Sequence, residues 1–444
     1  MNEPAPRRQA FQAPPGTRDV LPPESDRWMR LLGVVHGHMR RAGFGLVHGP
    51  VFEDAGVFQR LGEGTDVVTK EMYDFHDRGD RHIALRPEST ASVARSFVQH
   101  RPSTPWKVWY AAAHFRYERA QAGRYRQHHQ FGAEVFGSND PDVDVEVMAL
   151  AWSVLRDLGL ERILLVVNSM GDPATRVAYS DALQEWLRDR HDELDPTDQA
   201  KIDTHPLRVL DSKKESTQAA MSGAPLIDEF LTAEAVEHFE RVQQGLGALG
   251  IPFALDPRLV RGLDYYTHTT FEIQSSAMQA AQSAIAGGGR YDGLVEDLGG
   301  PKTPGVGFGS GIERVLLAAD AERSFVPPPP TVDVFVVDAT DGTVARDLSH
   351  ELRRAGLSAD RAFDQRSMRS QMKSADRSGA TVAVIVGEQE LTDGVVTVRD
   401  LRGERGQRTV PRDRVVEELL AVLADGPGED GPDQRRYDWL GGEE

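Results

Sequence analysis

The chain has 444 residues, about three times the ~150 residues of a typical domain, so we expect two or three domains. It is 39% hydrophobic and 27% charged, as ordinary soluble globular proteins are, and it has no cysteine. The lack of cysteine excludes disulfide scaffolds, thiolate metal sites, iron–sulfur clusters and cysteine nucleophiles. The net charge of −18 excludes a protein that binds polyanions over its whole surface, so any contact with nucleic acid must use local basic patches.

The N-terminal segment has no recognisable secretory signal. Residues 1–15 contain two arginines and no apolar stretch. No apolar run in the chain approaches the roughly 18 residues that a membrane helix needs. We therefore expect a cytoplasmic protein without a membrane partner.

Residues 1–326 predict a sheet with flanking helices. Helical patterns cover Trp28–Ala42, Thr90–Gln99, Asp142–Leu158, Pro173–Arg190 and Glu234–Leu249. Strand-like runs cover Leu46–Phe52, Arg81–Arg86, Lys107–Phe115, His128–Phe136 and Ile163–Asn168. Because several strands follow one another without a helix between them, we expect an α+β domain with a largely antiparallel sheet. Residues 169–250 look mostly helical and are predicted to be an insertion.

A domain boundary is predicted at four consecutive prolines, Pro327 to Pro330, which form a stiff, extended run. Strand-like and helical segments alternate over residues 331–424, which favours a small α/β domain. These segments are Asp333–Val337, Thr343–Ala355, Met368–Ser378, Ala380–Gly387, Val395–Leu401 and Pro411–Leu423. The acidic tail of residues 425–444 has a composition that buries little, and it is predicted to be disordered.

Several familiar enzyme motifs are missing from the sequence. There is no P-loop, no H-E-x-x-H helix and no G-x-S-x-G turn. The glycines from Gly305 to Gly311 do not form a dinucleotide-binding turn, because Ser310 stands where the third glycine belongs. His128 and His129 are adjacent on a predicted strand, so their side chains point to opposite faces and would not share a metal ion.

What the sequence does contain is a set of arginine–carboxylate clusters. They lie at Arg86–Thr90, at Phe115–Arg119 with a return through Gln130 and Glu134, at Leu259–Tyr266, at Gly287–Asp292 and at Gly307–Arg314. Guanidinium groups bind phosphate bidentately, and carboxylates hold ammonium groups and magnesium. One cluster alone indicates little, because buried arginine–carboxylate pairs are often structural. The joint occurrence of the clusters favours a site that clamps a polyphosphate.

These segments resemble the histidyl-tRNA synthetases, which are class II aminoacyl-tRNA synthetases, from about Ala13 to Ala424. Pro15–Asp19 is similar to the N-terminal signature of the family, Gly43–Phe52 to motif 1, Phe115–Phe136 to motif 2 and Gly307–Arg314 to motif 3. Leu259–Tyr266 and Ala286–Gly293 resemble the histidine-specific signature. The resemblance implies a class II catalytic domain over residues 1–326, an anticodon-binding domain over residues 331–424, and a homodimer built through motif 1.

The resemblance also implies a reaction. L-histidine attacks the α-phosphate of ATP, with Mg²⁺ present, to give histidyl-adenylate and pyrophosphate, and the histidine then passes to the 3′ end of tRNA(His). Arg116 matches the motif 2 arginine that contacts the α-phosphate, and Arg314 matches the motif 3 arginine at the far end of ATP. Arg261 matches the catalytic arginine of the family. No magnesium ligand is assigned to the protein.

The remaining matches concern the two other substrates. Residues that match the histidine pocket are Glu88, Thr90, Gln130, Glu134, Arg261, Tyr265 and Tyr266. A hydrogen-bonding pocket of this kind rejects isosteres strongly, so no editing domain is required. Residues of the motif 2 loop that are expected to reach tRNA are Arg119, Arg124 and Arg126. A second basic segment, Arg353–Arg377, lies in the predicted anticodon-binding domain.

Three positions depart from the usual family pattern. Ser89 stands where the family usually has glycine, and Ala120 replaces a usual proline in the motif 2 loop. His128 occupies the place of the phenylalanine that stacks on adenine. Because an imidazole also stacks, His128 is still expected to contact ATP.

An inactive, synthetase-like regulatory subunit of histidine biosynthesis is the alternative. Such paralogues typically lack the C-terminal domain and lose motif residues, whereas this chain keeps both. An RNA-binding module without catalysis is a further alternative, but it would not need Arg261, Glu88 and Glu134 together.

Overall fold

The computed structural model describes residues 11–60, 67–118, 123–210, 212, 214–260, 265–279, 283–327 and 332–424. The chain divides into two compact units, of which one comprises residues 1–21 and 28–326 and the other residues 22–27 and 327–444. Among the described residues, no helix is both long enough and apolar enough to cross a lipid bilayer. The predicted tail of residues 425–444 lies outside the described residues.

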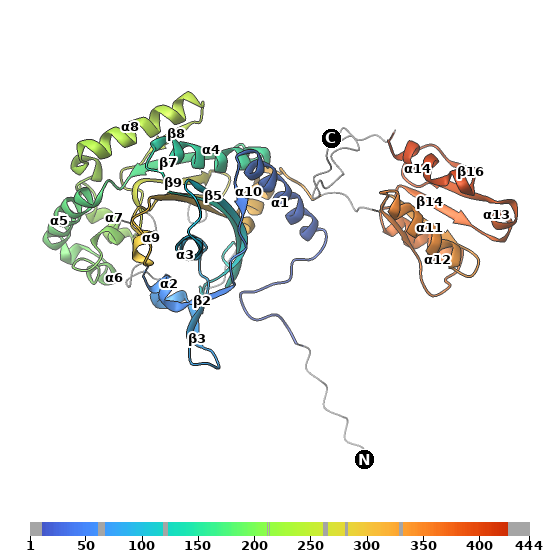
Figure 1. Ribbon diagram of the computed structural model, residues 1–444, viewed down its shortest axis with the longest axis horizontal. Helices are drawn as coiled ribbons and strands as arrows, with labels where there is room; N and C mark the ends of the chain where they lie inside the picture. Colours follow the sequence, from blue (N-terminus) through green and yellow to red (C-terminus); the bar gives the residue numbers. More distant parts are fainter. Residues whose placement is uncertain are drawn as a thin grey trace, which may run out of the picture. The chain divides into compact units, whose positions relative to one another are not determined.

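The first unit is built on an 8-stranded sheet with the strand order β1-β5-β6-β11-β10-β9-β7-β8 (Figure 1). Its strands are β1 (Gly45–Leu46), β5 (Trp106–Phe115), β6 (Gln127–Phe136), β7 (Ile163–Ser169), β8 (Phe253–Leu255), β9 (Thr267–Ser275), β10 (Ala284–Arg290) and β11 (Gly305–Gly311). Only the outermost pairs, β1–β5 and β7–β8, are parallel. The prediction of a largely antiparallel sheet is therefore confirmed.

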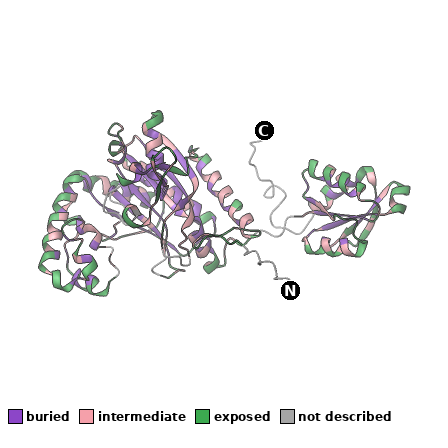
Figure 2. Ribbon diagram, turned by 90° about the horizontal axis from the view of Figure 1, so that it is seen from below, coloured by how far each residue is buried: buried purple, intermediate pink, exposed green. Residues whose placement is uncertain are grey.

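Three helices cover one face of this sheet. They are α1 (Glu24–Arg41), α4 (Pro141–Asp157) and α10 (Ile312–Glu322). In α1 the apolar residues Leu31, Val35 and Met39 recur every four positions, so they form one stripe that packs into the largest core cluster. Figure 2 shows the buried residues concentrated in the sheet and on the inner sides of the helices, while the outer helix faces are exposed.

The opposite face of the sheet carries a second core cluster and leaves room for a site. On β6, Phe131, Ala133 and Val135 belong to the first cluster, whereas Phe136 belongs to the second, as the alternation of a strand requires. The second cluster joins the sheet to α2 (Ala55–Gln59), α3 (Thr90–His100) and α9 (Leu294–Asp297). Figure 1 shows α3 lying within the curve of the sheet.

A small sheet of order β2-β4-β3 precedes α3. Its strands are β2 (Phe52–Asp54), β3 (Tyr73–His76) and β4 (His82–Leu85), and a short helical turn covers Val67–Glu71. The predicted strand over Leu46–Phe52 is wrong in its middle, because only its two ends are extended into sheets. Pro50 cannot donate to a strand ladder, and the carbonyl groups of Gly49 and Pro50 instead accept hydrogen bonds from Arg86 at 3.0 and 3.2 Å.

The segment between β7 and β8 is helical, as predicted. Its helices are α5 (Pro173–Asp189), α6 (Pro196–Gln199), α7 (Glu215–Ala220) and α8 (Ala233–Ala248), with short 3-10 turns at His191–Glu193, Pro206–Val209 and Ile227–Phe230. Tyr179, Leu183 and Leu187 of α5 lie in a separate core cluster of this segment. The segment therefore has an apolar core of its own.

The second unit contains a mixed 5-stranded sheet of order β13-β12-β14-β15-β16. Its elements are β12 (Val334–Asp338), α11 (Thr343–Arg354), β13 (Ala359–Arg361), α12 (Met368–Arg377), β14 (Val382–Val386), α13 (Glu388–Asp393), β15 (Val395–Asp400), β16 (Gln407–Pro411), a 3-10 turn at Arg412–Arg414, and α14 (Val415–Ala424). The predicted helix over Pro411–Leu423 begins too early, because Pro411 still pairs with Val395 in the sheet. The α/β character of this unit is confirmed.

The closest strand approach in the large sheet depends on glycine. A side chain at Gly288 of β10 would overlap the backbone oxygen of Gly307 on β11. Backbone atoms cannot move aside as a flexible side chain can. We therefore expect any larger residue at this position to disturb the centre of the sheet.

We predict that Gly288→Ala destabilises the protein by about 1–3 kcal/mol, which is the usual cost of overpacking. Gly247→Ala is the matched control, because Gly247 lies in α8 and an added methyl group would meet nothing within 4 Å. The control should be neutral or slightly stabilising, since alanine favours a helix. Urea unfolding followed by circular dichroism measures both, and equal midpoints for the two variants would contradict the prediction.

Candidate active site

The central strands of the sheet are rich in glycine, so few side chains project from them at the site. Gly287 pairs with Gly309, and Gly289 pairs with Gly307, across β10 and β11. A side chain at Gly307 would overlap the carboxylate of Glu134. The glycines thus leave the space that the polar groups of β6 occupy.

Glu134 is the most deeply buried carboxylate on this floor, with no exposed surface. Its Oε1 accepts a hydrogen bond of 2.7 Å from the hydroxyl of Thr90, and its Oε2 accepts one from the hydroxyl of Tyr291. Burial raises the pKa of Glu134 to about 8, although the two hydroxyl donors act in the opposite direction. The group therefore sits close to its titration point near neutral pH.

Glu88 lies beside this group at the start of α3. Its carboxylate accepts hydrogen bonds from the backbone N–H groups of Thr90 and Ala91, at 2.8 and 2.7 Å. These are orphan donors of a helix N-terminus, so Glu88 takes the place of a capping residue. Burial raises the pKa of Glu88, and the two backbone donors and the charge of Arg116 oppose that rise.

Tyrosines enclose the two carboxylates. The rings of Tyr265 and Tyr266 are 4.7 Å apart, and Tyr265 also contacts Tyr291 at 5.7 Å. Tyr110 of β5 is buried on the same side, and burial raises its pKa well above the usual value, as does the nearby charge of Glu134. The result is a buried cluster of two acids and several hydroxyl groups, whose chemistry suits a small cationic ligand.

A cavity of about 240 Å³ lies next to this carboxylate cluster. Its lining includes Arg116, Arg124, Arg314, His128 and Gln130 together with Glu118, Glu272 and Glu313. Gln130 lies on β6 between His128 and Glu134, so one strand face connects the cavity to the buried carboxylate. The prediction that His128, Gln130 and Glu134 share one face is confirmed.

Backbone carbonyl groups hold the two motif arginines in place. Arg116 donates from Nε to the carbonyl of Pro87 at 2.9 Å, and Arg314 donates from Nη1 to the carbonyl of Ala284 at 2.9 Å. Burial lowers the pKa of Arg314, and the nearby charges of Arg124 and Arg116 lower it further. The arginines repel one another, so an anion bound between them would be favoured.

The two adjacent histidines separate as predicted. His129 faces the helical side, where its Nδ1 lies 3.0 Å from Glu313 and its ring contacts Trp28 of α1. His128 faces the cavity, and burial together with the charge of Arg116 lowers its pKa to about 3. His128 is therefore neutral at physiological pH.

The expected tRNA-contacting arginines are only partly described. Arg119 and Ala120 lie outside the described residues. Arg124 pairs with Glu118 at 3.5 Å, and the Arg126 guanidinium lies 4.0 Å from the centre of the Tyr117 ring. The backbone N–H of Arg126 donates to the carbonyl of Gly16 at 2.8 Å, which ties the N-terminal signature to the motif 2 loop.

Arg261 also lies outside the described residues, as do its neighbours up to residue 264. Arg290, in the histidine-specific signature, points away from the pocket and is paired with Asp144 of α4, both fully buried. Two adjacent residues of the signature therefore have different roles: Tyr291 contacts the buried carboxylate, whereas Arg290 has a structural role.

The sequence analysis did not single out several residues of the site. These are Tyr110, His114, Glu118, Glu272, Tyr291 and Glu313. The position of Tyr110 and His114 on the site face could have been predicted, because they alternate with Arg116 along the chain and so share its face. Glu272 was not, because the sequence analysis left its strand, β9, unassigned.

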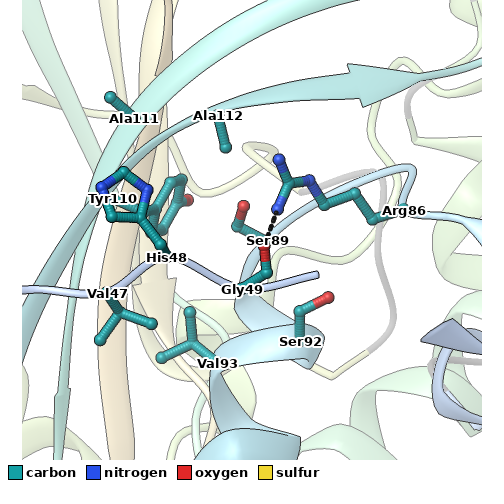
Figure 3. Close-up of a pocket in the computed structure, with 10 residues that line it drawn as sticks. All are labelled: Val47, His48, Gly49, Arg86, Ser89, Ser92, Val93, Tyr110, Ala111 and Ala112. Atoms are coloured by element: carbon teal, nitrogen blue, oxygen red, sulfur yellow. Dashed lines mark hydrogen bonds between the residues drawn. The ribbon is translucent and has the colours of Figure 1, made fainter. Parts of the chain in front are cut away.

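A smaller cavity of about 30 Å³ lies behind α3, and Arg86, Ser89, Ser92 and Tyr110 are among its lining (Figure 3). Arg86 reaches across it to the carbonyl of Gly49. Its volume suits one or two water molecules rather than a substrate. The larger cavity and the carboxylate cluster are therefore the candidate substrate sites.

Comparisons with known proteins agree with this arrangement. A family model described as histidyl-tRNA synthetase matches residues 16–315, and one described as anticodon binding domain matches residues 331–422. The histidine–tRNA ligase of Geobacillus thermodenitrificans is 47% identical over 402 residues, covering 88% of this chain and 94% of the relative. That of Rhodococcus erythropolis is 46% identical over 420 residues, covering 93% and 98%.

A solved structure is similar over nearly the whole chain. The apo histidyl-tRNA synthetase of S. aureus superposes with a TM-score of 0.79 at 36% identity, covering 92% of this chain and all 100% of the other. The antiparallel sheet and the helices on its faces are therefore shared with that protein, and the predicted fold class is confirmed.

The raised pKa of Glu134 predicts a pH dependence of stability. Its ordinary value of 4.5 applies to the unfolded chain, and about 8 applies to the folded protein. Between these values the folded state binds the additional proton, so this group's contribution to the free energy of unfolding falls as the pH rises from about 4.5 to about 8. Glu134→Gln should remove that contribution and flatten the curve.

Urea unfolding at several pH values within this window measures the slope. The exposed Glu185 of α5 provides the control variant, Glu185→Gln, which should keep the wild-type slope. A Glu134→Gln protein with the wild-type slope would show that Glu134 does not hold the proton.

Proposed function

The chain belongs to the histidyl-tRNA synthetase family, and we propose that its two adjoining pockets divide the histidine–tRNA ligase reaction between them. The reaction activates L-histidine with ATP to histidyl-adenylate and pyrophosphate, and it then transfers histidine to the 3′ end of tRNA(His). The observation that carries the proposal is one strand face, on which Glu134 lies in the acidic pocket and His128 in the arginine-lined cavity.

The acidic pocket is proposed to bind histidine. Glu88 is placed to attract the α-ammonium group, and Glu134 is placed to accept from an imidazole N–H. Thr90 fixes one oxygen of Glu134 by its hydrogen bond of 2.7 Å, so the carboxylate has a set orientation. Tyr265 and Tyr266 supply the walls, and Gln130 lies where this pocket meets the cavity.

The larger cavity is proposed to bind ATP with its accompanying magnesium. Arg116 and Arg314 provide fixed cations for the phosphates, and the neutral His128 ring provides a surface for adenine. Glu118 and Glu272 line the same cavity and offer carboxylate oxygens, which are the ligands that Mg²⁺ prefers. A magnesium ion held there would supply positive charge against the phosphates.

No nucleophile from the protein is needed, because histidine itself supplies the attacking oxygen. The chain's own part is to hold the reactants together and to stabilise the charge that develops at the α-phosphate. Arg116 acts there from β5, and Arg261 is proposed to act from the histidine-specific signature. This assignment of Arg261 rests on the sequence match.

Transfer to tRNA is proposed to use both units. Arg119, Arg124 and Arg126 of the motif 2 loop are proposed to meet the acceptor end, and residues 331–424 to bind the anticodon. The basic segment Arg353–Arg377 of the second unit supports that role, because arginine and lysine contacts to phosphate dominate nucleic-acid affinity. The enzyme would serve translation in the cytoplasm.

A homodimer is proposed through the motif 1 segment. β1 forms one edge of the large sheet, so its outer side is not paired within the described residues. Leu46, Val51 and Phe52 are exposed apolar side chains of this segment. An interface between two copies would cover both the strand edge and these side chains.

The regulatory-subunit alternative is disfavoured. A protein that had lost catalysis would have no need to keep Arg116 and Arg314 held by backbone carbonyl groups toward one cavity. It would also have no need for the unit that matches the anticodon-binding model.

We predict that the protein exchanges pyrophosphate into ATP with histidine and with no other of the twenty amino acids. The assay uses the full chain with labelled pyrophosphate and magnesium. Exchange with histidine alone would establish both the activation step and its specificity. Folded protein that exchanges with no amino acid would instead favour the regulatory subunit.

We predict that Arg261→Ala lowers the rate of adenylate formation by about 10²–10³-fold, the usual loss when one preorganised charge-stabilising donor is removed. Arg258→Ala is the matched control, because Arg258 is exposed three positions earlier in the chain. Rapid-quench measurement of adenylate with saturating histidine and ATP separates chemistry from binding. An unchanged rate in Arg261→Ala would remove Arg261 from the catalytic step.

A further inference from the structure

Two positions that depart from the family pattern, Ser89 and His128, are brought together in the structure by a third side chain. His114 of β5 pairs directly with His128 of β6, so the two imidazoles lie on the same face of the sheet. Their ring centres are 5.6 Å apart. Ser89 covers His114 from the other side, with its Oγ 2.7 Å from Nε2 of the ring.

His114 has no exposed surface, and Ser89 is 3% exposed. A polar ring in such a place is costly unless its nitrogens are paired. Nε2 is paired with Ser89, but Nδ1 has no hydrogen-bond partner among the described residues. This buried ring nitrogen of His114 therefore still requires a partner.

Both imidazoles are neutral in the site. Burial lowers the pKa of His114 well below its usual value, and the charges of His128, Arg86 and Arg116 lower it further. A neutral imidazole has one N–H donor and one acceptor nitrogen. Each neutral ring therefore has one nitrogen that can accept a hydrogen bond.

These donors and acceptors fit one continuous chain of hydrogen bonds. When the Ser89 hydroxyl is the donor in its contact with Nε2 of His114, the proton of His114 is on Nδ1. Nδ1–H can then donate to the acceptor nitrogen of His128. At 5.6 Å between centres, a turn of the two rings toward each other brings these nitrogens within hydrogen-bonding reach.

We propose that Ser89, His114 and His128 form one positioning chain that orients the His128 imidazole against the adenine of ATP. Ser89 stands between Glu88 and Thr90, so the chain also links the adenine side of the site to the turn that holds the histidine pocket. His114 touches neither substrate and acts through His128. The inference rests on the proposed function, because it assumes that ATP occupies the larger cavity.

The chemistry explains why the polar residues belong together. A phenylalanine that stacks on a base needs only packing, whereas an imidazole stacks in one orientation only if its nitrogens are held. His114 provides the hold for His128, and the Ser89 hydroxyl sets the tautomer of His114. A glycine at position 89 would leave Nε2 without its partner.

The test measures Michaelis constants for ATP and for histidine in the histidine-dependent exchange of pyrophosphate. His114→Leu should raise KM for ATP by about 3- to 10-fold, the range that corresponds to one net hydrogen bond, and should change KM for histidine much less. Ser89→Ala should do the same and keeps the ring in place. Thermal unfolding of each variant shows that the protein is folded.

The decisive comparison repeats the His114→Leu substitution in a protein that already carries His128→Phe. A phenyl ring stacks without nitrogen partners, so His114→Leu should have little effect on KM for ATP when His128 is already Phe. An unchanged KM for ATP in both His114→Leu and Ser89→Ala would overturn the proposal. So would an equal effect of His114→Leu in both backgrounds, because His114 would then act through packing alone. Wild-type protein that exchanges no pyrophosphate would overturn the proposed function itself.

Discussion

The burial of the Glu134 carboxylate is the constraint on which the rest of the site depends. A carboxylate without solvent contact is costly, so the protein must supply donors and space around it. Thr90 and Tyr291 supply the donors from α3 and from the end of β10, and Gly307 supplies the space. The glycine-rich strands, the position of α3 and the tyrosine walls all follow from keeping this acid buried and oriented. A ligand that brings its own positive charge and N–H groups then finds a pocket that is already arranged for it.

The same reasoning explains how an acidic protein can bind a polyphosphate. The net charge of −18 is spread over the whole chain, whereas the large cavity gathers Arg116, Arg124 and Arg314 within one wall. Burial, and after it the charges of the other two arginines, lowers the pKa of Arg314, and backbone carbonyl groups rather than carboxylates hold two of the three arginines. Because Arg116 and Arg314 are held by neutral carbonyl groups, their charges can attract a phosphate that enters, although three glutamates line the same cavity. The local arrangement of the arginines therefore matters for binding a polyphosphate, and the net charge of the whole chain does not.

Much of this organisation could be predicted from the sequence, and the failures have physical causes. Alternation along β6 correctly put His128 and Gln130 on one face and His129 on the other, because that period depends only on the strand geometry. The predicted strand at Leu46–Phe52 failed because Pro50 interrupts a ladder that an apolar pattern alone suggests. β10 was not assigned as a strand because its glycines lack the side chains that mark a strand. The partners of Glu134 come from positions 90 and 291, a separation that no local pattern reveals.

Arg290 and His114 show why a motif cannot be read as a list of ligand contacts. Arg290 belongs to the signature most specific for the family, yet its guanidinium is buried against Asp144 on the helical side of the sheet. His114 lies in none of the signature segments named from the sequence, yet it lies on the site face between Ser89 and His128. The difference follows from strand alternation and from where each polar group finds partners. A buried polar residue is retained only with its partners, so a departure at one position of a site is understood only together with the side chains that satisfy its hydrogen bonds.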